Sequence, residues 1–583
     1  MLAAFVFALP LATDAACQIE TLDLPVKMMG SRAVATVGIN GTPVPLTVDS
    51  GAFYSMLTEA AAMRLNLPKR HLTGVRIEGI TGQVDAYLTT VEKLQLLKGD
   101  IPRVDFVVGG NEPGAGTMGL LGRNLLSFTD TEYDLANGVI RFSFPNRDCA
   151  KANLAYWAGA THVTEVDLEP ERSDSKTPAL RARVKLNGTE FVAILDTGAT
   201  TIVTGRAARR AGVTEAQMTP SGTVYGAGRG SAKGWVAPFD RFEIGDEAIT
   251  QNRLPVGEFK LDDAGLLLGI DFFLAHRIYV SKAQSKMFIT YNGGTVFALN
   301  RSRAPGAVPS SAEPAASSAH AADADQFARR AAALTARRDY ERALVELSKS
   351  LELEPTSAAH FAQQGEVHEA LRRPADALAS YDRALELDPT FADARYRRVM
   401  LRIGAKDRDG AKSDLDALDK SLASQADLRL AMAGRYMELE QPAQSLVQLN
   451  QWLLAHPAET RRANALNGRC FARAMLGIEL DQALEDCNEA VAASNSSNAP
   501  YLDSRGWVQL RLGKYQRALA DFDRALELRP GVAFTLYGRG LAKLRLGDAA
   551  QSEADLASAR KAQPDIDLNV TRAGLMLAQE PKP

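Results

Sequence analysis

Two carboxylates in the first half of the chain each end an apolar run in the same way. Asp49 lies in "LTVDSGA", residues 46–52, and Asp196 lies in "AILDTGA", residues 193–199. A hydroxyl residue and a glycine follow each aspartate. Two carboxylates held close together cannot both ionise, so one can act as a base while the other acts as an acid. The repeated motif therefore predicts acid–base chemistry on a water molecule, provided that the fold brings Asp49 and Asp196 together.

The sequence around the two motifs repeats with the same spacing. A shift of 147 residues aligns Asn40–Gly41 with Asn187–Gly188, and Gly122 of "GLLGRNLL" with Gly269 of "GLLLGIDFF". Short runs rich in valine, isoleucine and threonine, separated by glycine, proline and Asn-Gly pairs, indicate β-strands throughout this half. We interpret the half as a duplicated β unit. The two Asn-Gly-Thr sequences match a glycosylation sequon, but their positions favour hairpin turns.

The motif and its downstream Leu-Leu-Gly sequence resemble one lobe of a retropepsin-like aspartic protease. The resemblance covers about residues 25–148 and 178–295, and it implies two tandem β-barrel lobes that form a pseudo-dimer without any cofactor or metal. It implies Asp49 and Asp196 as the catalytic pair. It also implies two kinds of supporting residue. Gly51 and Gly198 would allow the backbone to come close to the catalytic water, and the hydroxyls of Ser50 and Thr197 would form a hydrogen-bonded pair between the lobes. Alanine follows each glycine, as in the retroviral branch, so we expect a working pH nearer neutrality.

Each copy also holds a glycine-rich segment 30 residues after its aspartate. By the same resemblance these segments are candidates for mobile flaps that close over a bound peptide. Plain hairpin turns remain the alternative, because glycine marks turns in general. The candidates are Gly79, Ile80, Thr81 and Gly82 in the first copy, and Tyr225, Gly226, Ala227 and Gly228 in the second.

The second half of the chain is rich in alanine, leucine, arginine and glutamate, which indicates helices. Pro355 and Pro389 are 34 residues apart, as are Pro530 and Pro564, and amphipathic runs such as "RALADFDRALELRP" precede them. This pattern resembles tetratricopeptide repeats over about residues 322–564. We expect about seven repeats, with degenerate ones in the middle. Stacked helix pairs of this kind imply a concave surface for a protein or peptide ligand.

Composition shifts divide the chain into segments. Leu2–Leu11 is too short an apolar run to span a bilayer but suits a signal peptide, although no basic residue precedes Lys27. A buried first strand is the alternative for this run. The predicted segments are a signal peptide at 1–16, lobe 1 at 17–149, an inter-lobe connection at 150–177, lobe 2 at 178–300, a Pro/Ala/Ser linker at 301–324, repeats at 325–564, and a C-terminal tail or capping helix at 565–583.

The four cysteines and the net charge indicate the cellular compartment and the classes of partner to expect. Pairing of Cys17 with Cys149 and of Cys470 with Cys487 is the most economical of three connectivities, and four free thiols are the alternative. Disulfides would agree with export to a bacterial periplasm or to the medium. No histidine lies at metal-ligand spacing from a cysteine. A formal net charge of −3 argues against a nucleic-acid partner, and we expect no membrane span in the mature chain.

Together these features predict an aspartic endopeptidase. Asp49 and Asp196 would activate a water, the peptide would lie in the cleft between the lobes, and the repeats would recruit substrates or partner proteins. Residues 17–302 would then fold and cleave a short peptide alone. Two alternatives stay open, namely a peptide-binding adaptor without catalysis and a homodimer that pairs Asp49 with Asp49 and Asp196 with Asp196.

Overall fold

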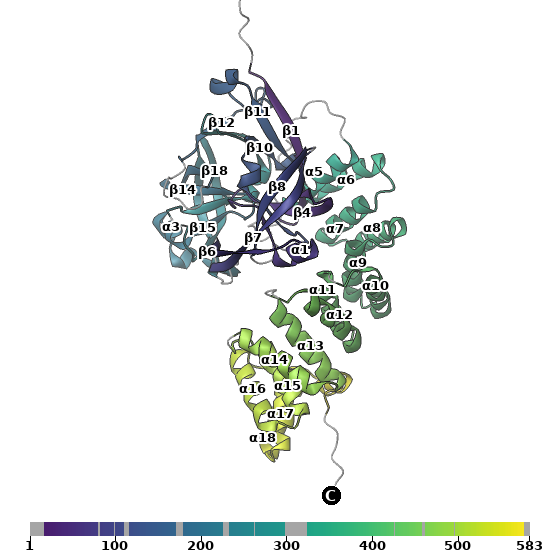
Figure 1. The fold of residues 1–583 in the computed structure, drawn as a ribbon. Coiled ribbons are helices and arrows are strands. Elements are labelled where there is room, and N and C mark those ends of the chain that lie inside the picture. Colours follow the sequence, from purple (N-terminus) through teal and green to yellow (C-terminus); the bar gives the residue numbers. More distant parts are fainter. Residues whose placement is uncertain are drawn as a thin grey trace, which may run out of the picture. The chain divides into compact units, whose positions relative to one another are not determined.

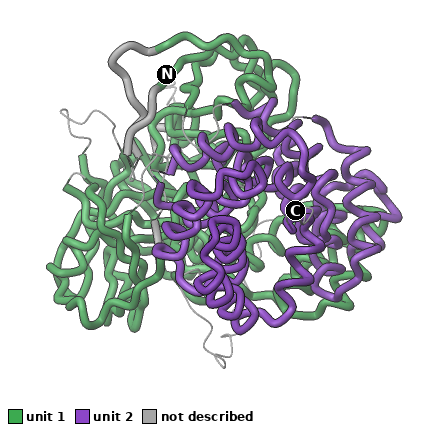
Figure 2. Tube along the Cα trace, turned by 90° about the horizontal axis from the view of Figure 1, so that it is seen from below, with its two compact units in different colours: residues 1–380 green, residues 381–583 purple. Residues whose placement is uncertain are grey.

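The computed structural model describes residues 17–576 except 80–81, 98, 110–115, 171–178, 225–231, 262, 298–322, 425, 458–460 and 495. The predicted signal peptide, most of the linker and six of the eight flap candidates lie outside the described residues. The chain divides into two compact units, residues 1–380 and 381–583, and each is described by itself (Figure 2).

The hairpin of β3 (Arg32–Ile39) and β4 (Thr42–Val48) carries the first aspartate motif. Asn40 and Gly41 between the strands have φ of 50° and 84°, the left-handed conformation that a tight two-residue turn needs. Asn187 and Gly188 repeat this turn with φ of 49° and 80°. The prediction of hairpin turns at both Asn-Gly pairs is therefore confirmed.

Lobe 1 is built on an eight-stranded sheet, in which the hairpin lies near one end (Figure 1). β4 runs parallel to β9, which contains the Leu-Leu residues of the downstream motif. The strands follow the order β2 (Lys27–Met29), β3, β4, β9 (Gly119–Leu121), β5 (Met56–Leu57), β8 (Gly99–Val108), β7 (Gly82–Leu96) and β6 (Arg70–Gly79).

Lobe 2 repeats this order strand for strand from β3 onward. β14 runs parallel to β19, as β4 does to β9. The strands follow the order β13 (Arg181–Leu186), β14 (Thr189–Asp196), β19 (Leu266–Gly269), β15 (Ile202–Thr204), β18 (Glu247–Gly257), β17 (Ala232–Ile244) and β16 (Thr219–Val224). Residues 171–178, where a counterpart of β2 would fall, lie outside the described residues.

A third sheet contains strands from both lobes and joins them. β10 of lobe 1 pairs with β20 of lobe 2. The order is β1 (Ile19–Pro25), β11 (Val139–Pro145), β10 (Asp130–Asp134), β20 (His276–Ser281), β21 (Lys286–Tyr291) and β12 (Thr164–Asp167). The residues predicted as a plain inter-lobe connection therefore contain a strand, β12, which pairs with β21 as β1 pairs with β11.

A buried charge cluster crosses the same sheet. Glu132 on β10 is inaccessible to solvent, and its carboxylate accepts hydrogen bonds from Arg141 at 2.5 Å and from Arg277 of lobe 2 at 2.7 Å. The Tyr156 hydroxyl donates a third, at 2.6 Å. A buried carboxylate is costly unless it is paired, so separation of the lobes would be opposed by this cluster as well as by the apolar core.

Short helices complete the lobes. Thr58 caps α1 and Thr204 caps α3. In each case the backbone amide of the third helix residue donates a hydrogen bond to the threonine hydroxyl. The helices are α1 (Glu59–Arg64), α2 (Arg123–Leu126), α3 (Gly205–Arg210) and α4 (Ile270–Ala275), with 3₁₀ turns η1 (Leu135–Asn137), η2 (Arg147–Lys151) and η3 (Glu215–Gln217).

Helices follow the lobes from α5 to α18 (Figure 1). Among the described residues between Ala324 and Ala562 there are fourteen, of 11 to 15 residues each, which is the number that seven helix pairs require. The predicted fold class, two β-rich lobes followed by an all-helical repeat region, is confirmed. The helices are α5 (Ala324–Ala336), α6 (Tyr340–Leu353), α7 (Ala358–Ala370), α8 (Pro374–Leu387), α9 (Ala392–Gly404), α10 (Arg408–Ser421), α11 (Leu428–Glu438), α12 (Pro442–Ala455), α13 (Arg462–Leu476), α14 (Leu480–Ala493), α15 (Ala499–Arg511), α16 (Tyr515–Leu528), α17 (Ala533–Arg545) and α18 (Ala549–Ala562), and α19 (Ile566–Arg572) follows them.

The first repeat helix, α5, packs against the lobes within unit 1. Its alanines Ala332, Ala333 and Ala336 are buried in the same apolar cluster as residues of the lobes, Val26 and Met28 among them. Arg330 donates a hydrogen bond of 3.0 Å to the Asn137 side chain of lobe 1, and Arg337 donates one to the carbonyl of Gly293 in lobe 2. α5 therefore contributes to the apolar core of the lobes, and the folding and activity of residues 17–302 alone stay a prediction.

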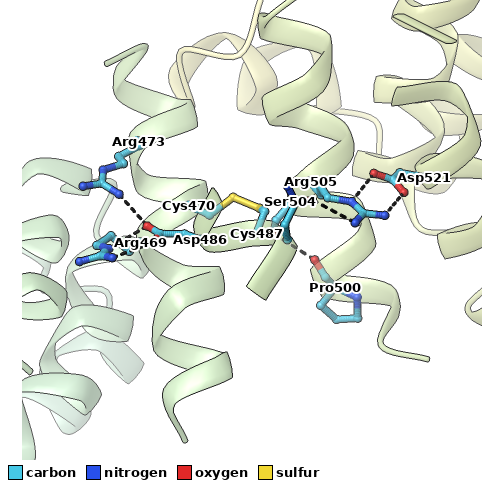
Figure 3. Close-up of a disulfide and its surroundings, with 10 residues drawn as sticks. Arg469, Cys470, Arg473, Asp486, Cys487, Pro500, Ser504, Arg505 and Asp521 are labelled. Atoms are coloured by element: carbon cyan, nitrogen blue, oxygen red, sulfur yellow. Dashed lines mark hydrogen bonds and ion pairs between the residues drawn. A yellow bond between two sulfur atoms is a disulfide. The ribbon is translucent and has the colours of Figure 1, made fainter. Parts of the chain in front are cut away.

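In unit 2, arginines of one helix bind aspartates of the next. Arg469 binds both carboxylate oxygens of Asp486, at 2.7 and 2.6 Å, and Arg505 binds Asp521 in the same way (Figure 3). The disulfide Cys470–Cys487 lies between these pairs, with Cα atoms 5.6 Å apart. In unit 1, Cys17 and Cys149 form a disulfide with Cα atoms 4.6 Å apart. Over the described residues, no helix combines the length and the apolar character that crossing a bilayer would need.

Candidate active site

The two aspartates stand at the same place in the two lobes. Asp49 follows the last residue of β4, and its amide donates a 3.0 Å hydrogen bond to the carbonyl of Leu121. Asp196 ends β14 and lies in register with Gly269 of the parallel strand β19. The parallel strand therefore fixes each aspartate loop from one side, which explains why an apolar-apolar-Gly sequence recurs at constant distance from the motif.

The glycine after each aspartate leaves space for the carboxyl of the other lobe. A Cβ atom added to Gly51 would lie 2.5 Å from Cγ of Asp196, and one added to Gly198 would lie 2.5 Å from Cγ of Asp49. Neither glycine has a positive φ, so both are required for space rather than for a special backbone conformation. The carboxyls of Asp49 and Asp196 hydrogen-bond to each other and form one dyad from one chain.

The hydroxyls of Ser50 and Thr197 cross-link the two loops. Each accepts a 3.0 Å hydrogen bond from the other residue's amide. Each also donates, Ser50 to the carbonyl of Leu195 and Thr197 to that of Val48, both at 3.0 Å. Both side chains are fully buried. Four reciprocal bonds hold the aspartate loops at a fixed distance, and serine serves as well as threonine because only the hydroxyl takes part.

Backbone amides also bind the carboxyls. Asp49 accepts hydrogen bonds from the amides of Gly51 at 2.9 Å and Ala52 at 2.7 Å, and Asp196 accepts one from Gly198 at 2.8 Å. Burial raises the pKa of both aspartates, and the charge of Asp49 raises the pKa of Asp196 further. The amide hydrogen bonds oppose this rise. Two buried carboxyls in this arrangement disfavour double ionisation, so the geometry is suited to a pair that shares one proton.

The sequence analysis missed the residues beneath each loop. In lobe 1 the Asn124 side chain accepts hydrogen bonds from the amide and hydroxyl of Ser55, at 2.7 and 2.8 Å. In lobe 2 Asp271 takes this place and accepts from the amide and hydroxyl of Thr201, at 3.0 and 2.5 Å. The shift of 147 relates Asn124 to Asp271, but Ser55 and Thr201 are 146 residues apart, so the constant shift reveals only half of each pair.

Both flap candidates lie at hairpin ends. In lobe 1, Gly79 ends β6 and pairs with Gly82 at the start of β7. In lobe 2, Val224 ends β16 and pairs with Ala232 of β17. Tyr225, Gly226, Ala227 and Gly228 lie between these two strands and outside the described residues, as do Ile80 and Thr81. The hairpins themselves are present, and a role in closing over substrate stays a prediction.

One group of side chains in the described part of the chain has ligand atoms close enough for a metal ion. It consists of Asp325, Glu354 and His360, in the first repeats rather than beside the dyad. His360 already hydrogen-bonds through Nδ1 to Ser350 at 2.9 Å and through Nε2 to Asp325 at 3.3 Å. These hydrogen bonds link α5, α6 and α7.

Comparison with known proteins finds matches in both parts of the chain. The family model of aspartyl proteases matches residues 35–125 and again residues 182–272, and a tetratricopeptide repeat model matches residues 499–532. No curated protein sequence matches the chain.

Solved structures similar to the chain include tetratricopeptide proteins. One from Parabacteroides merdae is 17% identical, covers 43% of this chain and 98% of its own, and has a TM-score of 0.32. YrrB, described as a TPR protein with an unusual peptide-binding site, is 20% identical, covers 39% and 96%, and has a TM-score of 0.24. The family-model matches show two segments similar to an aspartyl protease domain and one similar to a tetratricopeptide repeat.

Proposed function

We propose that the protein is an aspartic endopeptidase whose single active site is formed by Asp49 and Asp196 of one chain. The observation that carries the proposal is the reciprocal fit of each motif glycine against the carboxyl of the other lobe. Such a fit serves no purpose for two separate turn-capping aspartates, because a capping carboxylate needs only its own loop.

The reaction needs no group beyond these side chains and water. A water between the carboxyls loses a proton to the ionised aspartate while its oxygen attacks the scissile carbonyl carbon. The protonated aspartate gives its proton to the carbonyl oxygen, which yields a neutral tetrahedral diol. Breakdown of the diol returns a proton to the leaving nitrogen, and the C–N bond breaks. The hydrogen bonds of Ser50 and Thr197 support this scheme, because they hold the dyad in place.

The contacts between the lobes favour a site within one chain over a homodimer. Strands β10 and β20 pair across the lobes, and the charge cluster at Glu132 links them, so each aspartate already has its partner. A peptide-binding adaptor is disfavoured by the buried dyad, since the raised pKa values of both aspartates cost stability that a mere binding groove would not require.

The repeats and the cell location complete the proposal. The tetratricopeptide region is proposed to recruit protein substrates or partners, because it contains no catalytic group and repeats of this kind bind proteins through their concave face. Export to a periplasm or to the medium is supported by the two disulfides, which persist in oxidising compartments.

A mixture of unstructured peptides tests the function. The full chain is incubated with the mixture in water enriched in ¹⁸O, and the products are analysed by mass spectrometry with Asp49→Asn as the control. We expect internal cleavages, one ¹⁸O in each new carboxyl group, and no cleavage by the control. Absence of cleavage by the native chain over pH 3–8, or equal cleavage by Asp49→Asn, would overturn the proposal.

A further inference from the structure

We propose that Arg32 is a positioning residue that keeps the shared proton on Asp196, so that Asp49 is the base and Asp196 the acid. The inference rests on the proposed peptidase function for its kinetic consequence. The charge relation between Arg32 and the dyad holds whether or not the chain cleaves peptides.

Continued two residues beyond its last pair, the hairpin register brings Arg32 level with Asp49. Val34 of β3 lies opposite Thr47 of β4, and two more residues of the same register bring Arg32 opposite Asp49. The Asn40–Gly41 turn sets this register, because Arg32 precedes the turn by as many residues as Asp49 follows it. Side chains at opposite positions of antiparallel strands project from the same face. The guanidinium is therefore on the side of the sheet where the dyad lies.

Arg32 is partly buried at the end of the β2–β3 hairpin, where it pairs with Met29. Burial lowers its pKa while the charge of Asp49 raises it, and in return Arg32 lowers the pKa of Asp49. Among the described side chains, Arg32 forms no ion pair with another acid. Its charge is therefore not neutralised elsewhere and acts on the dyad.

Lobe 2 has no charge at the matching place. Leu195 donates a backbone hydrogen bond to Leu180, and the same register brings Ala179 opposite Asp196. A cation next to one carboxyl and a methyl group next to the other make the ionised form of Asp49 the more stable. The two lobes share the same backbone fold, but the carboxyls of Asp49 and Asp196 differ in acidity.

In the described part of the chain, three further ionisable groups lie on elements around the aspartate loops, and none places a second cation on Asp49. Tyr133 of β10 is buried and neutral, because burial raises its pKa. Arg123 of α2 is buried and acts on Tyr133. Asp271 of α4 lies beneath lobe 2, and burial raises its pKa. Among the residues that the structure describes, Arg32 is the basic side chain whose charge lowers the pKa of Asp49.

The pH profile of kcat/KM tests the role of Arg32 in the full chain. Loss of the charge in Arg32→Gln raises the pKa of the base, so kcat/KM at the acid end of the profile falls about tenfold while the plateau changes less. Arg32→Lys restores the acid limb in large part. Lys27→Gln is the matched control, because Lys27 lies on the same hairpin with its side chain exposed, and its profile should match the native one. A uniform loss at all pH values in Arg32→Gln would indicate a purely structural role and overturn the proposal.

Carbon-13 NMR of the aspartate carboxyls gives a readout that needs no cleavage. The two signals are assigned with Asp49→Asn and Asp196→Asn. We expect Asp49 to ionise at lower pH than Asp196, and the gap to narrow in Arg32→Gln. If Arg32→Gln does not fold, Ala179→Arg replaces it and should lower the ionisation midpoint of Asp196.

These outcomes separate the two proposals. Unchanged order and midpoints in the variants would overturn the role of Arg32, even if the native chain is a peptidase. The predicted NMR shifts without any cleavage would overturn the peptidase and leave the charge relation standing.

Discussion

The two lobes share one backbone plan and differ in the charges around it. Strand order, the Asn-Gly turn, the motif glycines and the bridging hydroxyls recur in both copies. Continuation of the hairpin registers brings Arg32 level with Asp49 in lobe 1 and Ala179 level with Asp196 in lobe 2. The features that bring the two carboxyls together are the same in both lobes, because each lobe must fit against the carboxyl of the other. The charges near the two carboxyls differ, because one carboxyl acts as an acid and the other as a base.

A second difference lies beneath the loops. Asn124 of lobe 1 and Asp271 of lobe 2 make matching hydrogen bonds to Ser55 and Thr201. An amide oxygen performs this task without a charge, so the carboxyl of lobe 2 is not needed for the hydrogen bonds. Each lobe therefore shows how the other would behave if its residue at this position were exchanged.

The largest effect is expected where the lobes are most symmetric, at the motif glycines. Gly51→Ala and Gly198→Ala each place a methyl group against the opposite carboxyl, which must move by about 1 Å and should lower kcat/KM by about 10²-fold or more. Steady-state kinetics on one peptide measures this, with circular dichroism to show that the fold is kept. Near-native activity in only one of the two variants would contradict the claim that the two glycines have equivalent roles.

Removal of α5 should destabilise the lobes by roughly 2–4 kcal/mol, because its buried alanines cover apolar side chains of the core. Denaturant unfolding of residues 17–302 is compared with that of residues 17–372, which retain α5, α6 and α7. Lobe 1 should lose more protection than lobe 2 in hydrogen exchange, since α5 packs on β2 and η1. Equal stability of the two fragments would show that the lobes are complete without the first repeat.

The bridging hydroxyls should contribute equally. Ser50→Ala and Thr197→Val each leave a buried amide and a buried carbonyl without a partner, at a cost of about 1–3 kcal/mol in the free energy of unfolding. Chemical denaturation measures both variants, and the double variant reports any coupling between the two hydroxyls, each of which makes its own two bonds within one network. A large effect in one lobe and none in the other would refute reciprocal bonding.

The smallest effect concerns Asp271, whose pKa burial raises. Below the unfolded pKa of about 4 the carboxyl is protonated in both states. As pH rises, the unfolded state releases its proton first, so the free energy of unfolding falls until the folded carboxyl ionises too. Asp271→Asn should remove this fall and make the chain more stable near pH 7, as Asn124 already does in lobe 1. Asn124→Asp should introduce the fall, and unfolding at a series of pH values checks both. An unchanged pH dependence in the two variants would contradict the inference.

Much of the fold could be predicted from the sequence because duplication makes motifs visible. Asp49 and Asp196 with their glycines recur at fixed spacing, and the Asn-Gly turns fix hairpin register by local geometry. The pairing of Arg32 with Asp49 could also have been found by counting from the turn. The cluster at Glu132 and the packing of α5 could not, because they depend on contacts between segments far apart in the chain.

The central claim is that one chain forms one site from both lobes. Asp49→Asn, Asp196→Asn, the double variant and a 1:1 mixture of the two single variants are assayed on the same peptide. We predict that all four preparations are inactive to the same extent, since each chain then holds only part of a dyad. Near-native cleavage by either single variant, or activity regained in the mixture, would show that aspartates pair between chains and would contradict the account.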